Sequence, residues 1–166
     1  GFITSHAVEN IELLEDADVK NFVGEYEPED YLLNPECPMA VGPYSITDYY
    51  MEAKRNQAEG TRNVSRVVKE VAEDFEKLSG RKYGLFEEYR MEDAERAVVI
   101  IGSAAGTTKD AVDRLREQGE KVGLIKIRLF RPFPADEIAE ALKNVKAIAI
   151  MDRAESYTNH GGPLGA

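Results

Sequence analysis

The carboxyl-terminal part of the sequence alternates short apolar runs with amphipathic stretches. Three runs, at 97–101, 122–127 and 147–151, are almost continuously apolar and are bounded by glycine or charged residues. Runs of this length and composition are typical of strands that are buried on both faces. The order strand, helix, strand, helix, strand, with short connections, predicts parallel strands joined by right-handed crossovers.

Two helices are predicted between these strands. The first runs from about Thr107 to Gln118, with Thr107 and Thr108 as capping residues and Gly119 at its end. The second covers about 135–142 and follows a stiff loop at 131–134. The resulting α/β domain, a three-layer parallel sheet, is placed at 91–166. Its predicted core consists of Val98, Val99, Ile100, Val112, Leu115, Leu124, Ile125, Ile127, Ile138, Leu142, Ile148 and Ile150.

Residues 51–90 are predicted to form a helical segment. Thr47 and Asp48 offer N-cap oxygens, few helix-breaking residues occur before Ser79, and Gly80 is placed to end the helix. One apolar stripe repeats at steps of three and four residues, which places its members on one side of the helix. The stripe consists of Val64, Val67, Val68, Val71, Phe75 and Leu78.

Residues 1–50 show no sustained period and are predicted to be an extended arm. Prolines at 28, 35, 38 and 43 block regular helix or central strand. Apolar residues between Ile11 and Phe22 are compatible with one or two helical turns. Both ends of the sequence are expected to be cut, because it starts at Gly1 without Met and stops before a helix that would cover the edge of the sheet.

The acidic composition excludes several classes of function. A net charge of -10, from 21 basic and 31 acidic residues, argues against nucleic-acid binding, which depends largely on Lys and Arg. The single cysteine, Cys37, excludes an internal disulfide and a cysteine-held zinc or iron–sulfur site within this sequence. No stretch has the length and hydropathy of a membrane span, and the first residues lack the features of an export signal. We therefore expect a cytoplasmic protein that contacts neither nucleic acid nor membrane.

Candidate chemistry lies in the loops that follow the three predicted strands, since ligands meet the carboxyl ends of parallel strands. Ser103, Gly106 and Thr107 belong to a loop of small residues, where backbone N–H groups could approach an anion at a helix start. We favour a plain tight turn here, because the full dinucleotide pattern and the P-loop lysine are absent.

Arg128 and Arg131 lie in the second of these loops, and Arg153 lies in the third. The first two arginines could clamp a carboxylate or phosphate, but we favour pairing with Asp or Glu across a subunit contact, because the sequence is so acidic. Arg153 is expected to pair with Asp152 or with the preceding loop.

Catalytic and metal residues are not predicted in this sequence. Asp152, Glu155 and His160 lack a metal-binding spacing. Ser5 and His6 are neighbours, which usually point apart, and no orienting acid accompanies them.

Six stretches, read in order, resemble the alpha part of the pyruvate:ferredoxin oxidoreductases, within the wider family of 2-oxoacid:acceptor oxidoreductases. The stretch through RPFP is the most specific of the six. The stretches are GFITSH at 1–6, VGPY at 41–44, GRKYG at 80–84, GSAAGT at 102–107, VGLIKIRLFRPFP at 122–134 and MDR at 151–153.

The resemblance implies a parent enzyme that converts pyruvate and coenzyme A to acetyl-CoA and carbon dioxide and reduces ferredoxin. That enzyme uses thiamine diphosphate, Mg²⁺ and iron–sulfur clusters. The resemblance also implies that 1–50 is the tail of a domain facing the thiamine pyrimidine, and that 91–166 is similar to the carboxyl-terminal domain of transketolase. The activating glutamate, the diphosphate–magnesium motif and the cluster cysteines have no counterpart here, so this chain alone is expected to hold no cofactor and to be non-catalytic.

Two other interpretations remain open from the sequence. The loops at 102–108 and 128–134 could hold a nucleotide or coenzyme A in a non-catalytic binding module. Alternatively, the α/β domain could belong to another thiamine-dependent enzyme. The 2-oxoacid also stays open, because members of the family that the sequence resembles accept 2-oxoglutarate, branched 2-oxoacids or indolepyruvate.

Overall fold

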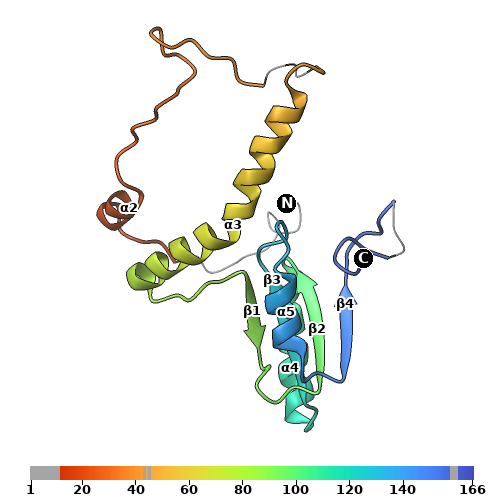
Figure 1. The fold of residues 1–166 in the computed structure, drawn as a ribbon. Helices are drawn as coiled ribbons and strands as arrows, with labels where there is room; N and C mark the ends of the chain where they lie inside the picture. Colours follow the sequence, from red (N-terminus) through yellow and green to blue (C-terminus); the bar gives the residue numbers. More distant parts are fainter. Residues whose placement is uncertain (1–11, 43, 45, 158–160) are drawn as a thin grey trace. The chain divides into compact units, whose positions relative to one another are not determined.

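The polypeptide divides into two compact units, one extending to Thr61 and the other running from Arg62 to Ala166. A computed structural model describes residues 12–42, 44, 46–157 and 161–166. Figure 1 shows the helices and strands in chain order.

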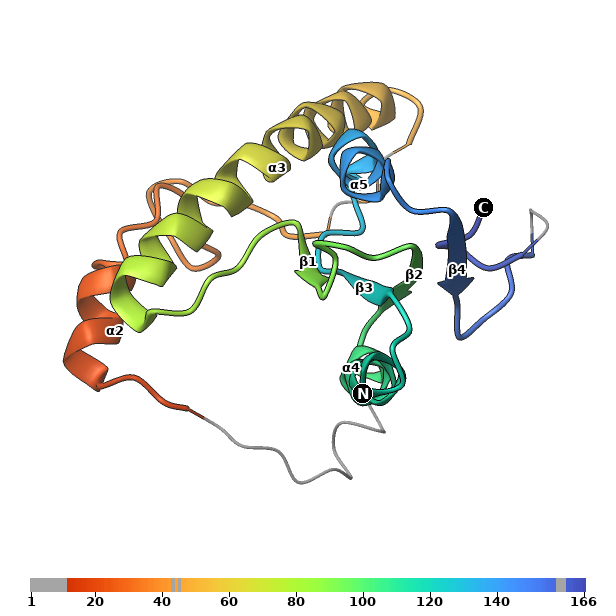
Figure 2. The same cartoon turned by 90° about the horizontal axis from the view of Figure 1, so that it is seen from below.

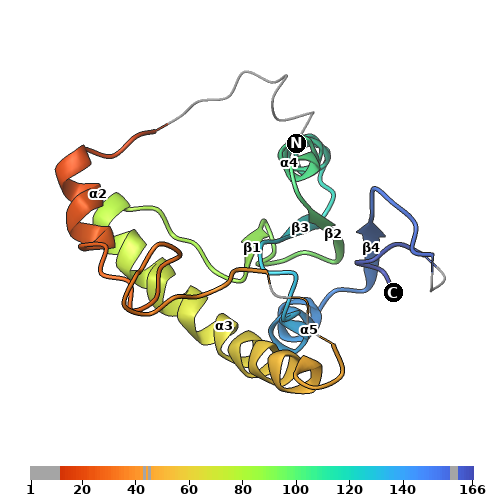
Figure 3. The same ribbon diagram turned by 90° about the horizontal axis from the view of Figure 1, so that it is seen from above.

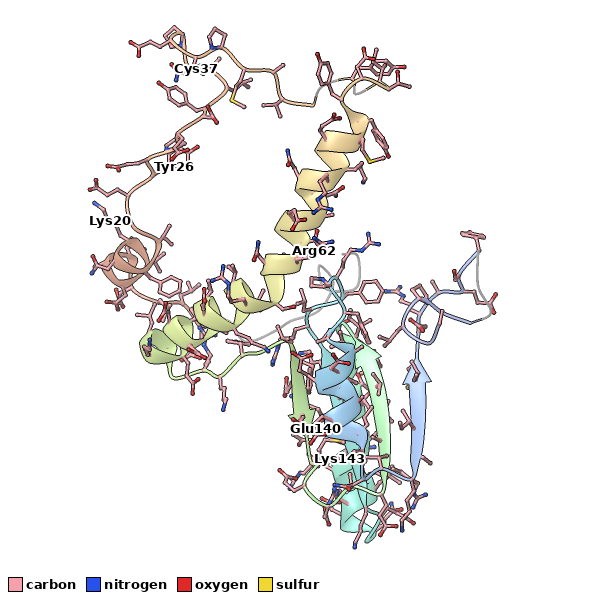
Figure 4. The ribbon with its side chains drawn as sticks, in the orientation of Figure 1. Lys20, Tyr26, Cys37, Arg62, Glu140 and Lys143 are labelled. Atoms are coloured by element: carbon pink, nitrogen blue, oxygen red, sulfur yellow. The ribbon has the colours of Figure 1, made fainter. Side chains whose placement is uncertain are left out.

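The first unit is mostly extended. Helix α2 (Asp16–Val23) buries none of its residues, and residues 24–49 contain no helix or strand in the part of the chain that is described. Cys37 is exposed on this segment (Figure 4). The described residues before Tyr50 thus contain one short helix and otherwise no regular secondary structure.

Helix α3 (Tyr50–Ser79) begins in the first unit and ends in the second. It starts directly after the turn that contains Thr47 and Asp48. At its other end Gly80 has φ +70°, a conformation that glycine adopts readily, and its amide donates to the Glu76 carbonyl oxygen at 2.8 Å. The predicted stop is therefore confirmed.

The second unit contains a four-stranded mixed sheet in the order β1, β3, β2, β4. Strands β2 (Arg96–Ile101), β3 (Val122–Ile127) and β4 (Ala147–Met151) are parallel, and β1 (Phe86–Tyr89) runs antiparallel to β3. Helix α4 (Ala104–Glu117) covers one face and α5 (Ala135–Leu142) covers the other, as Figures 2 and 3 show. The predicted α/β class with three layers is confirmed.

Strand β1 is the main departure from the sequence prediction, which placed it inside the helical segment 51–90 and expected parallel strands only. Its residues, FEEY, are too few and too polar to produce an apolar run. Nonlocal hydrogen bonds fix it instead. Next to it, the amides of Arg128 and Leu129 donate to the Leu85 carbonyl oxygen at 3.0 and 2.8 Å.

Helix α4 begins earlier than predicted. It starts at Ala104, so Thr107 and Thr108 lie inside its first turns rather than at its cap. Gly102, with φ +86°, turns the chain out of β2, and the helix-favouring alanines follow at once. The Thr108 hydroxyl then donates to the Ala104 carbonyl oxygen at 2.9 Å within the helix.

The core has one apolar cluster on each face of the sheet. Val99, Ile125, Ile127 and Ile138 form the cluster on the α5 side, and Ile100, Ala105, Val112 and Leu124 form the one on the α4 side. Seven of the twelve predicted core residues are buried, namely Val99, Ile100, Val112, Leu124, Ile125, Ile127 and Ile138.

Three predicted core residues are wrong for this chain. Leu115, Ile148 and Ile150 have 40%, 48% and 49% of their surface exposed. Both isoleucines lie on β4, which pairs with β2 on one side and with no strand on the other among the described residues. An apolar run therefore identified the strand but could not distinguish an edge position from a central one.

A polar contact ties β1 to α4. The Tyr89 hydroxyl donates to the Asp113 carboxylate at 2.6 Å, and the Arg90 guanidinium lies 3.1 Å from the same carboxylate. The Tyr89 hydrogen bond is the main cause of a lowered pKa for Asp113, with a further contribution from the charge of Arg90 against the opposing effect of desolvation. The folded state therefore favours the ionised carboxylate.

Replacing Ile125 with Asp should prevent folding of the full chain. Ile125 is fully buried in β3, and an unpaired buried charge costs several kcal/mol, comparable with a total stability of about 5–15 kcal/mol. Circular dichroism during denaturant unfolding tests this. Ile101→Asp is the matched control, because Ile101 is 39% exposed and should retain a cooperative transition. A soluble, cooperatively unfolding I125D chain would show that the core is misplaced.

Replacing Asp113 with Asn should lower the free energy of unfolding at pH 7 and have less effect in acid. Because the folded pKa is depressed, the stabilisation is present above the ordinary Asp pKa of about 4 and is lost as the pH falls through the folded value. Urea unfolding of both chains from pH 7 downwards measures this. Asp110→Asn, on the same helix, should cost less at pH 7. A difference between wild type and D113N that stays constant with pH would contradict the assignment.

Candidate functional site

The three candidate loops start at one edge of the sheet. The register pairs Ile101 with Ile127 and Ile100 with Met151, so β3, β2 and β4 end at nearly the same level. Adjacent strands are about 4.8 Å apart. The loop at 102–108 therefore starts between the loops that begin at Arg128 and Asp152. The sequence predicted that the three loops follow the carboxyl ends of the strands, but not their order across the sheet.

The topology also directs the two crossovers to opposite faces at this edge. The chain moves from β2 to β3 through α4, and then back past β2 to β4 through α5. Two right-handed crossovers in opposite directions place their helices on opposite faces of the sheet. Strands β2 and β4 consequently flank a switch point, the position where doubly wound sheets bind ligands.

The loop of small residues provides a helix start without a side-chain cap. Ser103 occupies the N-cap position of α4 but makes no capping hydrogen bond, and the first turn contains no acidic residue. Gly106 donates its amide to the Ser103 carbonyl oxygen at 3.2 Å, and a Cβ built at Gly106 meets no atom within 4 Å. Close packing inside this chain does not require a glycine at this position.

Arg128 is held by the edge strand of its own chain. Its guanidinium lies 2.7 Å from the Glu87 carboxylate and 5.0 Å from the centre of the Tyr83 ring. Arg128 thus pairs with an acidic residue of its own chain, and a further contact across a subunit interface stays a prediction. The sequence did not identify Glu87 as the partner, because it did not predict strand β1, on which Glu87 lies.

Lys109 shares the Glu87 carboxylate with Arg128. The Lys109 ammonium ion on α4 contacts one carboxylate oxygen, and Arg128 contacts the other. Burial raises the pKa of Glu87, but the hydrogen bond from Lys109 and the charges of Lys109, Arg128 and Lys126 together bring it below its ordinary value. Glu87 is thus ionised at neutral pH, between cations from two segments of the chain, α4 and the end of β3.

Arg131 and Arg153 are not brought into this cluster. Both are exposed, and within the described ranges neither has an ion pair. Arg131 precedes a cis peptide bond to Pro132, and the neighbouring rings of Phe130 and Phe133 pack edge to face at 6.3 Å. Of the six candidate residues from the three loops, all of which the structure describes, Arg128 is the one that forms an ion pair.

Asp152 closes the last turn of the chain instead of pairing with Arg153. Its carboxylate accepts hydrogen bonds from the amides of Leu164, at 3.0 Å, and Gly165, at 2.9 Å. Leu164 packs against the core cluster on the α5 side. A Cβ at Gly162 would collide with the Asp152 side chain, so this turn depends on a glycine. The predicted ion network at Asp152 is therefore wrong.

Metal and catalytic candidates receive no support from the described residues. In the described ranges, no group of three or more His, Cys, Asp or Glu side chains could hold a metal ion. Ser5, His6 and His160 lie outside these ranges. None of the helices there is both long and apolar enough to cross a membrane.

Two family sequence models match the chain in succession. Residues 1–73 match the thiamine diphosphate-binding domain of the pyruvate flavodoxin/ferredoxin oxidoreductases. Residues 94–166 match core domain II of the pyruvate:ferredoxin oxidoreductases. The second match covers the parallel strands, α4, α5 and the three candidate loops.

Curated relatives match almost the whole chain. It is 49% identical to pyruvate synthase subunit PorA of Thermotoga maritima over 95% of its length, and 38% identical to the PorA subunit of Methanothermobacter thermautotrophicus over 97%. It is also 38% identical to the alpha subunit of the NADH-dependent phenylglyoxylate dehydrogenase of Aromatoleum evansii over 99%. The chain spans only 40%, 42% and 41% of these three relatives.

The described part of 12–73 does not enclose a thiamine diphosphate site by itself. No residue from 12 to 73 is buried wherever the structure describes this stretch, so no enclosed cradle for a diphosphate exists there. The assignment therefore rests on sequence and fold together. The chain matches two family models in succession and is extensively identical to curated subunits. The second family match also covers the α/β domain. The chain belongs to the pyruvate:ferredoxin oxidoreductase family.

Proposed function

We propose that this chain is part of the alpha-type subunit of a thiamine-dependent pyruvate:ferredoxin oxidoreductase. The enzyme would convert pyruvate and coenzyme A to acetyl-CoA and carbon dioxide, with transfer of two electrons to ferredoxin. The observation that supports this most strongly is the 49% identity to a pyruvate synthase subunit over 95% of the chain. The order of the two family matches, thiamine-binding domain before core domain II, agrees with it.

Within that enzyme, the chain supplies structure around the active site rather than the reacting groups. Thiamine diphosphate, Mg²⁺ and iron–sulfur clusters belong to other parts of the enzyme, and the cytoplasm is its location. The arm at 1–50 is the end of the domain that faces the thiamine pyrimidine, and 91–166 is a domain similar to the carboxyl-terminal domain of transketolase.

Exposed apolar surfaces of the second unit support this structural role. On α3, Val67 and Val71 are 42% and 51% exposed and line a hollow of about 350 Å³ with Phe75 and Tyr83. A second hollow, of about 250 Å³, lies beside α4 and β4 and is lined by Leu115 and Ile148 among others. Surfaces of this kind usually mark contacts with other protein surfaces.

A second substrate and acceptor pair deserves a direct comparison. The phenylglyoxylate dehydrogenase subunit is 38% identical to this chain, and the PorA subunit of Methanothermobacter thermautotrophicus is also 38% identical to it. By its name, that enzyme acts on phenylglyoxylate and depends on NADH. Phenylglyoxylate and pyruvate are both 2-oxoacids and differ in the group attached to the oxo carbon.

Assay of the complete enzyme that contains this chain should show coenzyme A-dependent oxidation of pyruvate with reduction of ferredoxin or a viologen. Phenylglyoxylate with NAD⁺, 2-oxoglutarate and branched 2-oxoacids serve as the comparison arms. The ratio of kcat/KM values between substrates is the measured quantity. Preference for phenylglyoxylate would reassign the substrate. No turnover of any 2-oxoacid, by an enzyme with bound thiamine diphosphate and intact clusters, would contradict the proposed function and favour a binding module.

A further inference from the structure

An excess of positive charge surrounds Glu87 although the chain as a whole carries a net charge of -10. The Glu87 carboxylate contacts Lys109 through one oxygen and Arg128, at 2.7 Å, through the other. Lys126 is the register partner of Glu87 in the pairing of β1 with β3. Two cations therefore contact one carboxylate, and a third lies opposite it in the sheet. We call this set of four residues the Glu87 cluster.

All four members of the Glu87 cluster are on the α4 face of the sheet. Lys126 and Arg128 are two positions apart at the end of β3, so both point to the same face. Glu87, directly opposite Lys126 in an antiparallel pair, shares that face. Lys109 comes from α4, which covers it.

The excess positive charge of the Glu87 cluster is partly buried, which strengthens its electrostatic effect. The side chains of Lys109, Arg128 and Glu87 are only 29%, 25% and 23% exposed. Repulsion between the cations is therefore weakly screened. Glu95 provides a contrast, because its two partners, Lys121 and Lys146, are 55% and 72% exposed to solvent.

The amino terminus of α4 adds to the positive potential beside this cluster. Gly102 and Arg128 immediately follow Ile101 and Ile127, which are paired in the sheet, so the start of α4 lies one strand away from Arg128. The first turn of this 14-residue helix contains no acidic residue, and Ser103 does not cap it. An uncapped helix amino terminus favours an anion.

Aromatic rings hold the two cations that contact Glu87. Arg128 lies 5.0 Å from the centre of the Tyr83 ring, and Lys109 lies 5.0 Å from that of Tyr89. Tyr89 is itself fixed by its hydrogen bond to Asp113. Such contacts with rings restrict where the charged groups lie.

We propose that Lys109, Lys126 and Arg128, with the amino terminus of α4, form a binding site for an oxyanion of a small molecule, of the phosphate class. Charged donors and a helix amino terminus match the several acceptor oxygens of a phosphate group. Glu87 holds Lys109 and Arg128 in place and leaves the cluster with positive charge to spare. The site is independent of the reaction proposed for the whole enzyme.

Titration of the full chain with inorganic phosphate tests the site. Calorimetry at constant ionic strength, with chloride as the balancing anion, should detect phosphate-specific binding. Lys126→Gln should weaken it about tenfold, which corresponds to the loss of about 1.4 kcal/mol of binding free energy. Lys121→Gln is the matched control, because Lys121 belongs to the exposed Glu95 group, and it should bind as wild type does. Absence of phosphate binding, or equal affinities of K126Q and K121Q, would overturn the proposal.

Glu87→Gln separates an anion site from a purely structural ion network. Removal of the competing negative charge should increase phosphate affinity several-fold, and phosphate should raise the melting temperature of E87Q more than that of wild type. A structural network predicts a destabilised chain that phosphate does not rescue relative to chloride, and that result would count against the proposal. If E87Q does not fold, the phosphate-induced shift in melting temperature of wild type against K126Q decides. Lys143→Gln is a second control, because Lys143 directly follows α5 and its side chain is exposed (Figure 4).

Discussion

The second unit depends on the burial of β3 on both of its faces. Leu124 packs on the α4 side, Ile125 and Ile127 pack on the α5 side, and all three side chains are almost inaccessible to solvent. The same strand pairs with β1 and with β2. At its start, a Cβ on Gly123 would lie 2.8 Å from the Arg90 carbonyl oxygen, so the connection from β1 to β2 can pass over the strand only beside a glycine. Both helices, both neighbouring strands and the β1–β2 connection are therefore positioned by six residues.

The ion pairs of this unit differ in how far they are exposed to solvent, and the half-buried ones lie beside β3. Where the ion pairs are open to water, as for Lys143 and Glu140 or Arg66 and Glu70, they contribute little to stability. The half-buried pairs cluster where β1, β3 and α4 meet, and they bind the antiparallel strand to the helix. The half-buried ion pairs therefore lie at β1, the one strand of the described sheet that runs antiparallel.

The sequence predicted those parts of the fold that depend on interactions between residues close together in the chain. Apolar runs predicted β2, β3 and β4, and glycine positions predicted the ends of α3 and α4, because these signals lie within a few residues. Strand β1 could not be found in this way, since its hydrogen bonds and the partners of Glu87 come from residues some 20 to 40 positions away. The same limit applies to the candidate site. The loop residues were located correctly at one edge, but Lys109 and Lys126 could enter only once the register was known.

The exposure of β4 shows a different limit. Ile148 and Ile150 have the composition of a buried strand, yet about half of each side chain is exposed. Composition reports the environment in which a strand functions, whereas exposure reports the neighbours present in this chain. In a family whose curated subunits are more than twice as long as this chain, the two need not agree.

The turn closed by Asp152 also limits how the sequence can change. Its carboxylate has room for the amides of Leu164 and Gly165 only because position 162 has no side chain. A residue that enlarged position 162 would expel the aspartate, and a loss of the aspartate would remove the partner of two amides. A substitution at either position is therefore expected to destabilise the turn unless the other position changes with it.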